Sequence, residues 1–139
     1  MSATLLAGIS RTTEPQTMLR RFLALDALVT GVNGLAYVAA SGPLGRFLGV
    51  DATVLVELGV FLVLFGAGVG FLAYRRQPPQ LPVKLVVDAN LLWAVLSIAA
   101  LALWLEPTTA GAVWIPLQAL TVAGFAVLQW SALRAATTA

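Results

Sequence analysis

Residues 54–74 read VLVELGVFLVLFGAGVGFLAY, a run in which Glu57 is the one charged side chain. An α-helix needs about 20 apolar residues to cross a hydrocarbon layer about 30 Å thick. The run therefore predicts a membrane-spanning helix. Comparable apolar windows occur on both sides of it, and together they predict four spans, at about 22–41, 53–74, 84–105 and 113–133.

The composition also indicates a membrane protein. Of the 139 residues, 60% are hydrophobic and 10% are charged, and the mean hydropathy is +0.92. Soluble domains carry about 45–50% apolar and about 25% charged residues. We expect one transmembrane domain at 21–134, with short tails at 1–20 and 135–139. Because the connections are short, each helix should pack beside its sequence neighbour in an all-α, up-down-up-down bundle.

The basic residues indicate how the spans are oriented. Positive charge collects on the cytoplasmic side of multi-pass proteins. Arg46 lies between the first and second spans, and the other seven basic residues lie before the first span, between the second and third, or after the fourth: Arg11, Arg20, Arg21, Arg75, Arg76, Lys84 and Arg134. Both termini and the middle connection are therefore predicted to be cytoplasmic.

Two pairs of polar residues recur at nearly constant spacing. Asp26 and Asp88 are 62 positions apart, and each opens a span behind a basic residue; Glu57 and Gln118 are 61 positions apart. This spacing indicates two tandem helical hairpins, which would be related by an axis along the membrane normal. Few other side chains match and charge is common at helix starts, so chance similarity is the alternative interpretation.

Polar residues follow one face of the first span. Asp26, Thr30 and Asn33 are four and three positions apart, a spacing that places them on one side of a helix. Hydrocarbon offers no hydrogen-bond partner, so this face should point into the bundle. With polar residues of the other spans it gives a candidate intramembrane polar cluster: Asp26, Thr30, Asn33, Glu57, Asp88, Asn90 and Gln118.

This candidate cluster has two interpretations. Hydrogen bonds between helices would fix the bundle, which is the interpretation that we favour; a polar pocket or solute path is the alternative. Asp26, Glu57 and Asp88 each lie about one turn inside a membrane boundary, near a helix start, where a carboxylate can meet free backbone N–H groups. Trp93 lies deep in the third span, so its indole N–H should find a partner inside the bundle.

Glycines distinguish the second span from the others. Gly59, Gly66 and Gly70 interrupt a helix that is otherwise rich in Leu, Val and Phe, and the last two form a small-xxx-small pair. Glycines at such spacing let another helix approach closely. We expect them to pack against a helix of the same chain, with dimerisation through this face as the alternative.

The residue types exclude several classes of chemistry. The chain has no cysteine and no histidine, which removes dithiol redox chemistry, thiolate and imidazole metal sites, and catalytic sets that use either residue. No phosphate-binding glycine loop occurs. We therefore expect no enzyme, cofactor or metal, and a net charge of only +2, with the basic residues at helix ends, gives no reason to expect a nucleic-acid partner.

These exclusions favour a non-catalytic accessory, scaffold or lipid-contacting helix bundle. Its partners would be membrane lipids and either a second copy of the chain or another membrane protein. The alternative is a small oligomeric transporter or channel that uses polar groups of spans 1, 2 and 4.

In overall pattern the chain resembles the small four-span integral membrane proteins of unassigned function from high-GC bacteria. The resemblance rests on three segments: Leu25-Asp26-Ala27, the connector at 42–49 and Thr108-Thr109-Ala110-Gly111. It implies a multi-pass protein of the bacterial inner (cytoplasmic) membrane and brings no activity with it. The chain is also superficially similar to small four-helix multidrug transporters, which place a glutamate deep in the first span. Here Asp26 lies near the end of that span and neutral Asn33 near its centre.

Overall fold

The computed structural model of this protein describes the backbone of residues 3–138 and the side chains of residues 15–137. Over that backbone all regular structure is helical: α1 (Ala3–Ala39), α2 (Ser41–Leu48), α3 (Ala52–Tyr74), α4 (Gln80–Leu103) and α5 (Thr109–Thr138). Four segments are long and apolar enough to cross a membrane: Pro15–Ala39, Ala52–Tyr74, Gln80–Leu103 and Thr109–Thr137. The predicted four-span, all-α fold is confirmed, and the chain is an integral membrane protein.

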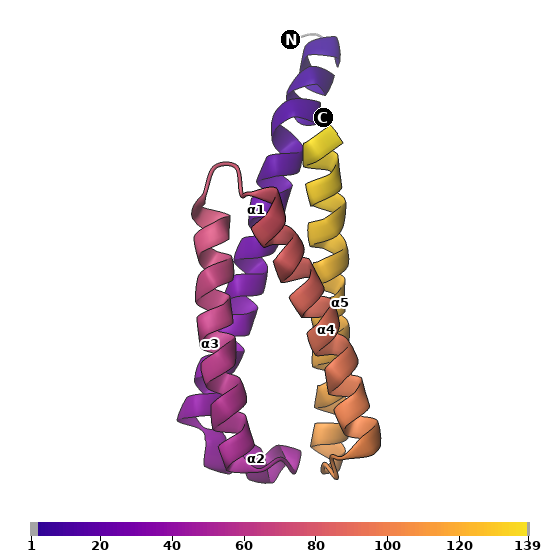
Figure 1. Cartoon of the computed structure of the whole chain (residues 1–139). Coiled ribbons are helices and arrows are strands. Elements are labelled where there is room, and N and C mark those ends of the chain that lie inside the picture. The colour runs from indigo at the N-terminus through magenta and orange to yellow at the C-terminus, as the bar shows by residue number, and fades with distance from the viewer. Residues whose placement is uncertain (1–2, 139) are drawn as a thin grey trace.

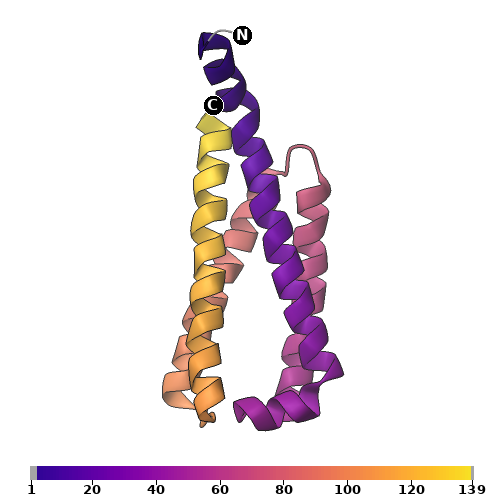
Figure 2. The same cartoon turned by 180° about the vertical axis from the view of Figure 1, so that it is seen from behind.

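The four long helices run alternately up and down and form two halves, α1 with α3 and α4 with α5 (Figure 1). Helix α1 also packs on α5, whereas the backbones of α3 and α4 approach each other little. This differs from the expectation that each helix lies beside its sequence neighbour. The two halves converge near the α3–α4 connection and diverge toward α2 in both views (Figure 2).

Side-chain size explains why the backbones of α1 and α3 approach closely, whereas those of α3 and α4 do not. Between α3 and α4, the rings of Phe61 and Trp93 stack with centroids 5.9 Å apart. Between α1 and α3, a Cβ atom built on Gly59 would lie 2.7 Å from the carbonyl oxygen of Gly34, and one on Gly66 would lie 3.1 Å from the backbone nitrogen of Gly31. Glycine pairs let two backbones nearly touch, while stacked aromatic rings hold them apart.

The structure thus places Gly59 and Gly66 in an interface within the chain. Gly70 is at the edge of this interface, since a Cβ atom there would meet only the Cβ of Ala27, at 3.6 Å. The contacts support the expected packing against a helix of the same chain.

The end of the bundle that carries both termini is closely packed (Figure 1). All four long helices contribute to its buried core: Leu19, Leu23, Val69, Leu72, Val83, Val86, Ala132 and Leu133. Arg20 donates from Nε to the carbonyl oxygen of Ala73 at 3.0 Å, near the end of α3. A cation there complements the negative end of the helix dipole and satisfies a free carbonyl group. This end is therefore fixed by both apolar packing and a polar contact.

Helix α2 lies across the opposite end of the bundle (Figure 1). It ends at Leu48 and is capped by Gly49, whose φ of 73° is in the left-handed region that glycine adopts most readily. Thr108 then donates its backbone N–H to the carbonyl oxygen of Leu48 at 3.2 Å, and its hydroxyl to that of Phe47. Helix α2 thereby connects the α1–α3 half to the start of α5 at the end where the halves diverge.

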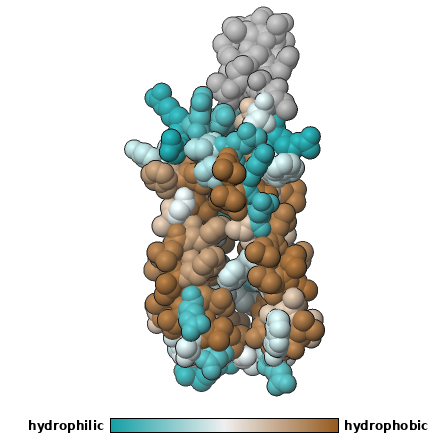
Figure 3. Space-filling model, viewed as in Figure 1, coloured by the Kyte–Doolittle hydropathy of each residue, from teal (hydrophilic) through white to brown (hydrophobic). Residues whose placement is uncertain are grey.

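The surface has a hydrophobic belt between two hydrophilic ends (Figure 3). Large apolar side chains such as Leu28, Leu64 and Leu120 are between 62% and 71% exposed in this belt. Such exposure is expected where lipid rather than water surrounds the helices. In the described part of the predicted N-terminal tail, residues 3–20 are helical and continue without a break into the first candidate span.

Candidate functional site

The strongest polar feature is a buried network centred on Asp26, whose exposed fraction is 0%. Thr30 donates its hydroxyl to Oδ1 of Asp26 at 2.9 Å. Asn90 donates from Nδ2 to Oδ2 at 2.8 Å, and Gln129 donates from Nε2 to the same oxygen at 2.7 Å. Asn90 also donates to Oε1 of Gln129 at 3.1 Å. We call these four residues the Asp26 network; it joins α1, α4 and α5.

The Asp26 network is well suited to hold helices together. Both carboxylate oxygens accept hydrogen bonds, and both amide side chains are engaged, so the members satisfy one another without water. Satisfied polar networks in a medium of low dielectric constant are rigid and costly to disturb. With Asp26 fully enclosed, a solute could reach the carboxylate only if the helices moved.

A second set of polar contacts lies nearer α2. Trp93 donates from Nε1 to Oε1 of Gln118 at 2.8 Å, which confirms the prediction that its indole N–H has a partner inside the bundle. Gln118 in turn donates to the carbonyl oxygen of Ile115 at 2.9 Å. Trp114 donates from Nε1 to the hydroxyl oxygen of Tyr37 at 2.7 Å, which bridges α1 and α5.

The structure brings together only part of the cluster that the sequence predicted. Asp26, Thr30 and Asn90 meet in the Asp26 network, and Gln118 belongs to the second set of contacts. Asn33 is half-buried and lines a cavity.

Glu57 and Asp88 are exposed and lie outside both sets of contacts. Glu57 is two positions from buried Leu55 and buried Gly59, and Asp88 is two positions from buried Asn90. Two positions turn a helix by about 200°, so both carboxylates lie on the opposite face from these neighbours. Asp26 and Asp88 therefore differ in environment, and the tandem-hairpin interpretation gains no support from them.

Gln129 is the member of the Asp26 network that the predicted cluster omitted. A signal for it exists in the sequence, because Gln118 and Gln129 are eleven positions apart. Eleven residues make about three full helical turns, which places both amides on one face of α5. This face supplies partners to Trp93 at one level and to Asp26 at another.

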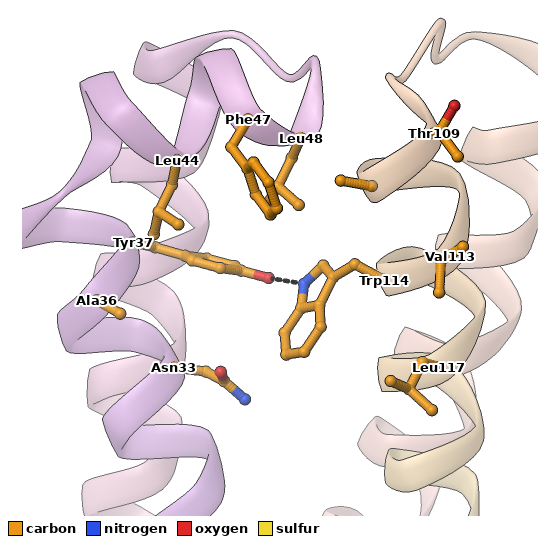
Figure 4. A pocket seen from close by; sticks show the side chains of 11 residues that line it. Asn33, Ala36, Tyr37, Leu44, Phe47, Leu48, Thr109, Val113, Trp114 and Leu117 are labelled. Atoms are coloured by element: carbon orange, nitrogen blue, oxygen red, sulfur yellow. Dashed lines mark hydrogen bonds between the residues drawn. The ribbon is translucent and has the colours of Figure 1, made fainter.

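A cavity of about 520 Å³ lies between the diverging halves, bounded by α1, α2 and α5. We call it the α2 cavity; its lining is Asn33, Ala36, Tyr37, Leu44, Phe47, Leu48, Thr109, Ala110, Val113, Trp114 and Leu117. Figure 4 shows the Tyr37–Trp114 hydrogen bond crossing it, with the Asn33 side chain directed into the space. The face formed by α3 and α4 is also hollowed between the two halves (Figure 3).

Three smaller cavities of about 320, 330 and 150 Å³ share lining residues with the α2 cavity or with one another. The linings of all four cavities contain no Asp, Glu, Lys or Arg. One of the smaller cavities reaches Thr30 and Asn90, so the space between the halves extends to the Asp26 network.

Among the residues whose side chains are described, no three His, Cys, Asp or Glu gather in a group that could hold a metal ion. Comparison with known proteins gave no match: no family model matches the chain, and neither a curated protein nor a solved structure is significantly similar to it. Evidence about the function therefore comes from the geometry of the cavities and the polar contacts.

Proposed function

We propose that this protein is a non-catalytic, lipid-contacting helix bundle that holds part of a lipid molecule in the α2 cavity. The observation that carries the proposal is the cavity itself. At about 520 Å³ it falls within the usual range for ligand sites of about 300–1,000 Å³, and apolar side chains line most of it. It lies between two helical halves of a membrane protein, where hydrocarbon chains are the abundant apolar molecules.

The lining of the α2 cavity supports a binding role rather than catalysis. It offers no carboxylate and no amine that could act as a general acid or base. Its polar side chains are Asn33, Tyr37, Thr109 and Trp114, which are uncharged groups of the kind that orient a bound molecule.

One experiment compares the lipid that copurifies with two matched variants. Ala36→Phe adds an aromatic ring inside the α2 cavity, whereas Ala67→Phe adds the same ring on an exposed face of α3 outside the four cavities. We expect the first variant to lose bound lipid by about tenfold or more, because the ring occupies the space of the chain. Mass spectrometry of protein purified in mild detergent measures the lipid per chain.

The Ala67→Phe variant should retain the wild-type amount of bound lipid. Equal lipid content in the two variants and the wild type, with folding intact, would contradict the proposal. Circular dichroism and the unfolding temperature in detergent establish that both variants fold.

A second candidate function is a small oligomeric transporter or channel. It is favoured by the cavity of about 330 Å³ that reaches Thr30 and Asn90, because this cavity leads toward the buried carboxylate of Asp26. Intramembrane carboxylates of this kind occur on proton and ion pathways. Proton or solute flux into proteoliposomes that is lost in Asp26→Asn would favour this candidate over the binding role.

We further propose that both termini and the α3–α4 connection face the cytoplasm, in the bacterial inner membrane. Arg20, Arg75 and Arg76 gather with Phe71 and Tyr74 around a hollow at this end. Basic and aromatic side chains at one boundary suit the anionic headgroups of a cytoplasmic leaflet.

Because the chain has no cysteine, single cysteines can test this orientation. An impermeant maleimide should label Glu106→Cys in intact spheroplasts and Gln77→Cys only after the membrane is opened, since the two exposed positions lie at opposite ends of the bundle. The reverse pattern would contradict the proposed orientation.

A further inference from the structure

We infer that the occupant of the α2 cavity is a neutral lipid whose carbonyl or hydroxyl group is hydrogen-bonded by Asn33. This inference rests on the proposed function, and it adds the chemical class of the bound molecule. Three observations carry it: the absence of charge in the cavity lining, the hydrogen-bonding state of the Asn33 amide and the depth of Asn33 along α1.

The lining of the α2 cavity has no charged side chain that could pair with an ionised headgroup. The same holds for the two cavities that share lining residues with it, of about 320 and 150 Å³. Moving an ionised phosphate into such a space removes its hydration without supplying a counter-charge, which is strongly unfavourable. An occupant whose head enters the cavity is therefore uncharged.

Asn33 is a lining residue whose side chain can bind a polar group of the occupant. Tyr37 and Trp114 already bond to each other, whereas Asn33 makes none of the hydrogen bonds found among the described side chains. Its amide offers both donors and acceptors, and it points into the cavity (Figure 4). An unpaired amide facing hydrocarbon is unfavourable by about 1–3 kcal/mol, so a carbonyl or hydroxyl group that pairs with it gains affinity.

The depth of Asn33 agrees with a neutral head. Asn33 lies six residues before Ala39, the last residue of α1, which is about 9 Å along the helix axis. Half of the hydrocarbon layer is about 15 Å thick, so this amide lies well below the headgroup region. A phospholipid held at the boundary by its phosphate does not bring its polar atoms to this depth, whereas a lipid without a charged head can.

The rest of the cavity fits the apolar part of such a lipid. Phe47 and Trp114 present aromatic rings, and Leu44, Val113 and Leu117 present branched side chains. Helix α2 supplies two of these five residues, so it forms one wall of the site as well as linking the two halves.

The test uses two probes with identical chains, dioleoylglycerol as the neutral lipid and dioleoylphosphatidylglycerol as the anionic one. Delipidated full-length protein is titrated with each, and native mass spectrometry measures the dissociation constants. We expect the wild type to bind the neutral lipid about tenfold more tightly or better, since the anionic head meets no counter-charge.

Asn33→Leu keeps the side-chain size similar but removes the amide. It should weaken the binding of dioleoylglycerol by about tenfold, because the lipid then loses its hydrogen bond. Ser131→Ala removes a polar group from an exposed position of α5 outside the cavities and should leave the affinity unchanged.

The outcomes separate this inference from the proposed function. Equal wild-type affinity for the two lipids, or undiminished binding of dioleoylglycerol by a folded Asn33→Leu variant, would overturn the neutral-lipid inference and leave lipid binding in place. If the wild type binds neither probe, and Ala36→Phe copurifies with as much lipid as the wild type, both proposals are overturned. The comparison of headgroups uses the wild type alone, so it does not depend on the folding of any variant.

Discussion

Asp26→Leu should lower the free energy of unfolding of the bundle by about 2–5 kcal/mol, the largest effect that we expect from one side chain. The substitution removes three hydrogen bonds in a buried space. The Gln129 amide then loses its acceptor, and the Asn90 amide keeps only Oε1 of Gln129. Unfolding by a denaturing detergent, followed by circular dichroism, measures the change.

Asp88→Leu is the matched control for this prediction. The two aspartates open their spans in the same way, but Asp88 is exposed, so its replacement should change stability by about 0.5 kcal/mol or less. Equal losses in the two variants would show that the Asp26 network does not hold the helices together.

A double-mutant cycle sharpens the test by measuring coupling within the network. Gln129→Leu removes one of the two donors to Oδ2 of Asp26. When Asp26→Leu is already present, the same change should have a smaller effect, by about 1 kcal/mol, because the shared bond is gone. Additive losses would contradict a direct bond between the two residues.

Part of the Asp26 network could be predicted from the sequence, because hydrocarbon offers no hydrogen-bond partner to a polar side chain. A polar side chain in an apolar span must find a partner, so the face of Asp26 and Thr30 is expected to point inward, with Asn90 as a candidate partner. The eleven-residue spacing of Gln118 and Gln129 carried the remaining information.

Which face of α3 and which face of α4 is buried could not be predicted in the same way. In water, the contrast between apolar and polar faces identifies the buried side of a helix, but lipid and protein interior are both apolar. Leucine therefore occurs on both sides: Leu23 is fully buried and Leu28 is 62% exposed. Without that contrast, the sequence predicts that Glu57 and Asp88 belong to the cluster, although their helices direct them outward.

The order of the spans was predictable from loop length and charge, but the spacing between helices was not. The spacing between two helices depends on which side chains meet there. Glycine meets glycine between α1 and α3, whereas Phe61 meets Trp93 between α3 and α4. The sequence shows these residues without showing which of them face one another. The α2 cavity results from that unequal spacing, so it could not be predicted from composition or periodicity.

Gly59→Ala, a substitution in the interface between α1 and α3, should cause the second large loss of stability. The added Cβ atom would lie 2.7 Å from the carbonyl oxygen of Gly34 and 2.7 Å from Cγ2 of Val38. Since a backbone atom cannot rotate away, the two helices must separate and lose close contact along their length. We expect the free energy of unfolding to fall by about 2–3 kcal/mol, measured by the same detergent unfolding.

Gly68→Ala is the control, because a Cβ atom at Gly68 meets nothing within 4 Å. This variant should be unchanged or more stable by up to about 1 kcal/mol, since alanine favours a helix. Equal behaviour of the two variants would contradict close packing at Gly59.

The added methyl group at Gly59 would also lie 3.0 Å from Cβ of Tyr37, whose hydroxyl bridges to Trp114 across the α2 cavity. Gly59→Ala should therefore weaken the binding of dioleoylglycerol, whereas Gly68→Ala should not, because the close glycine contact positions one wall of the lipid site.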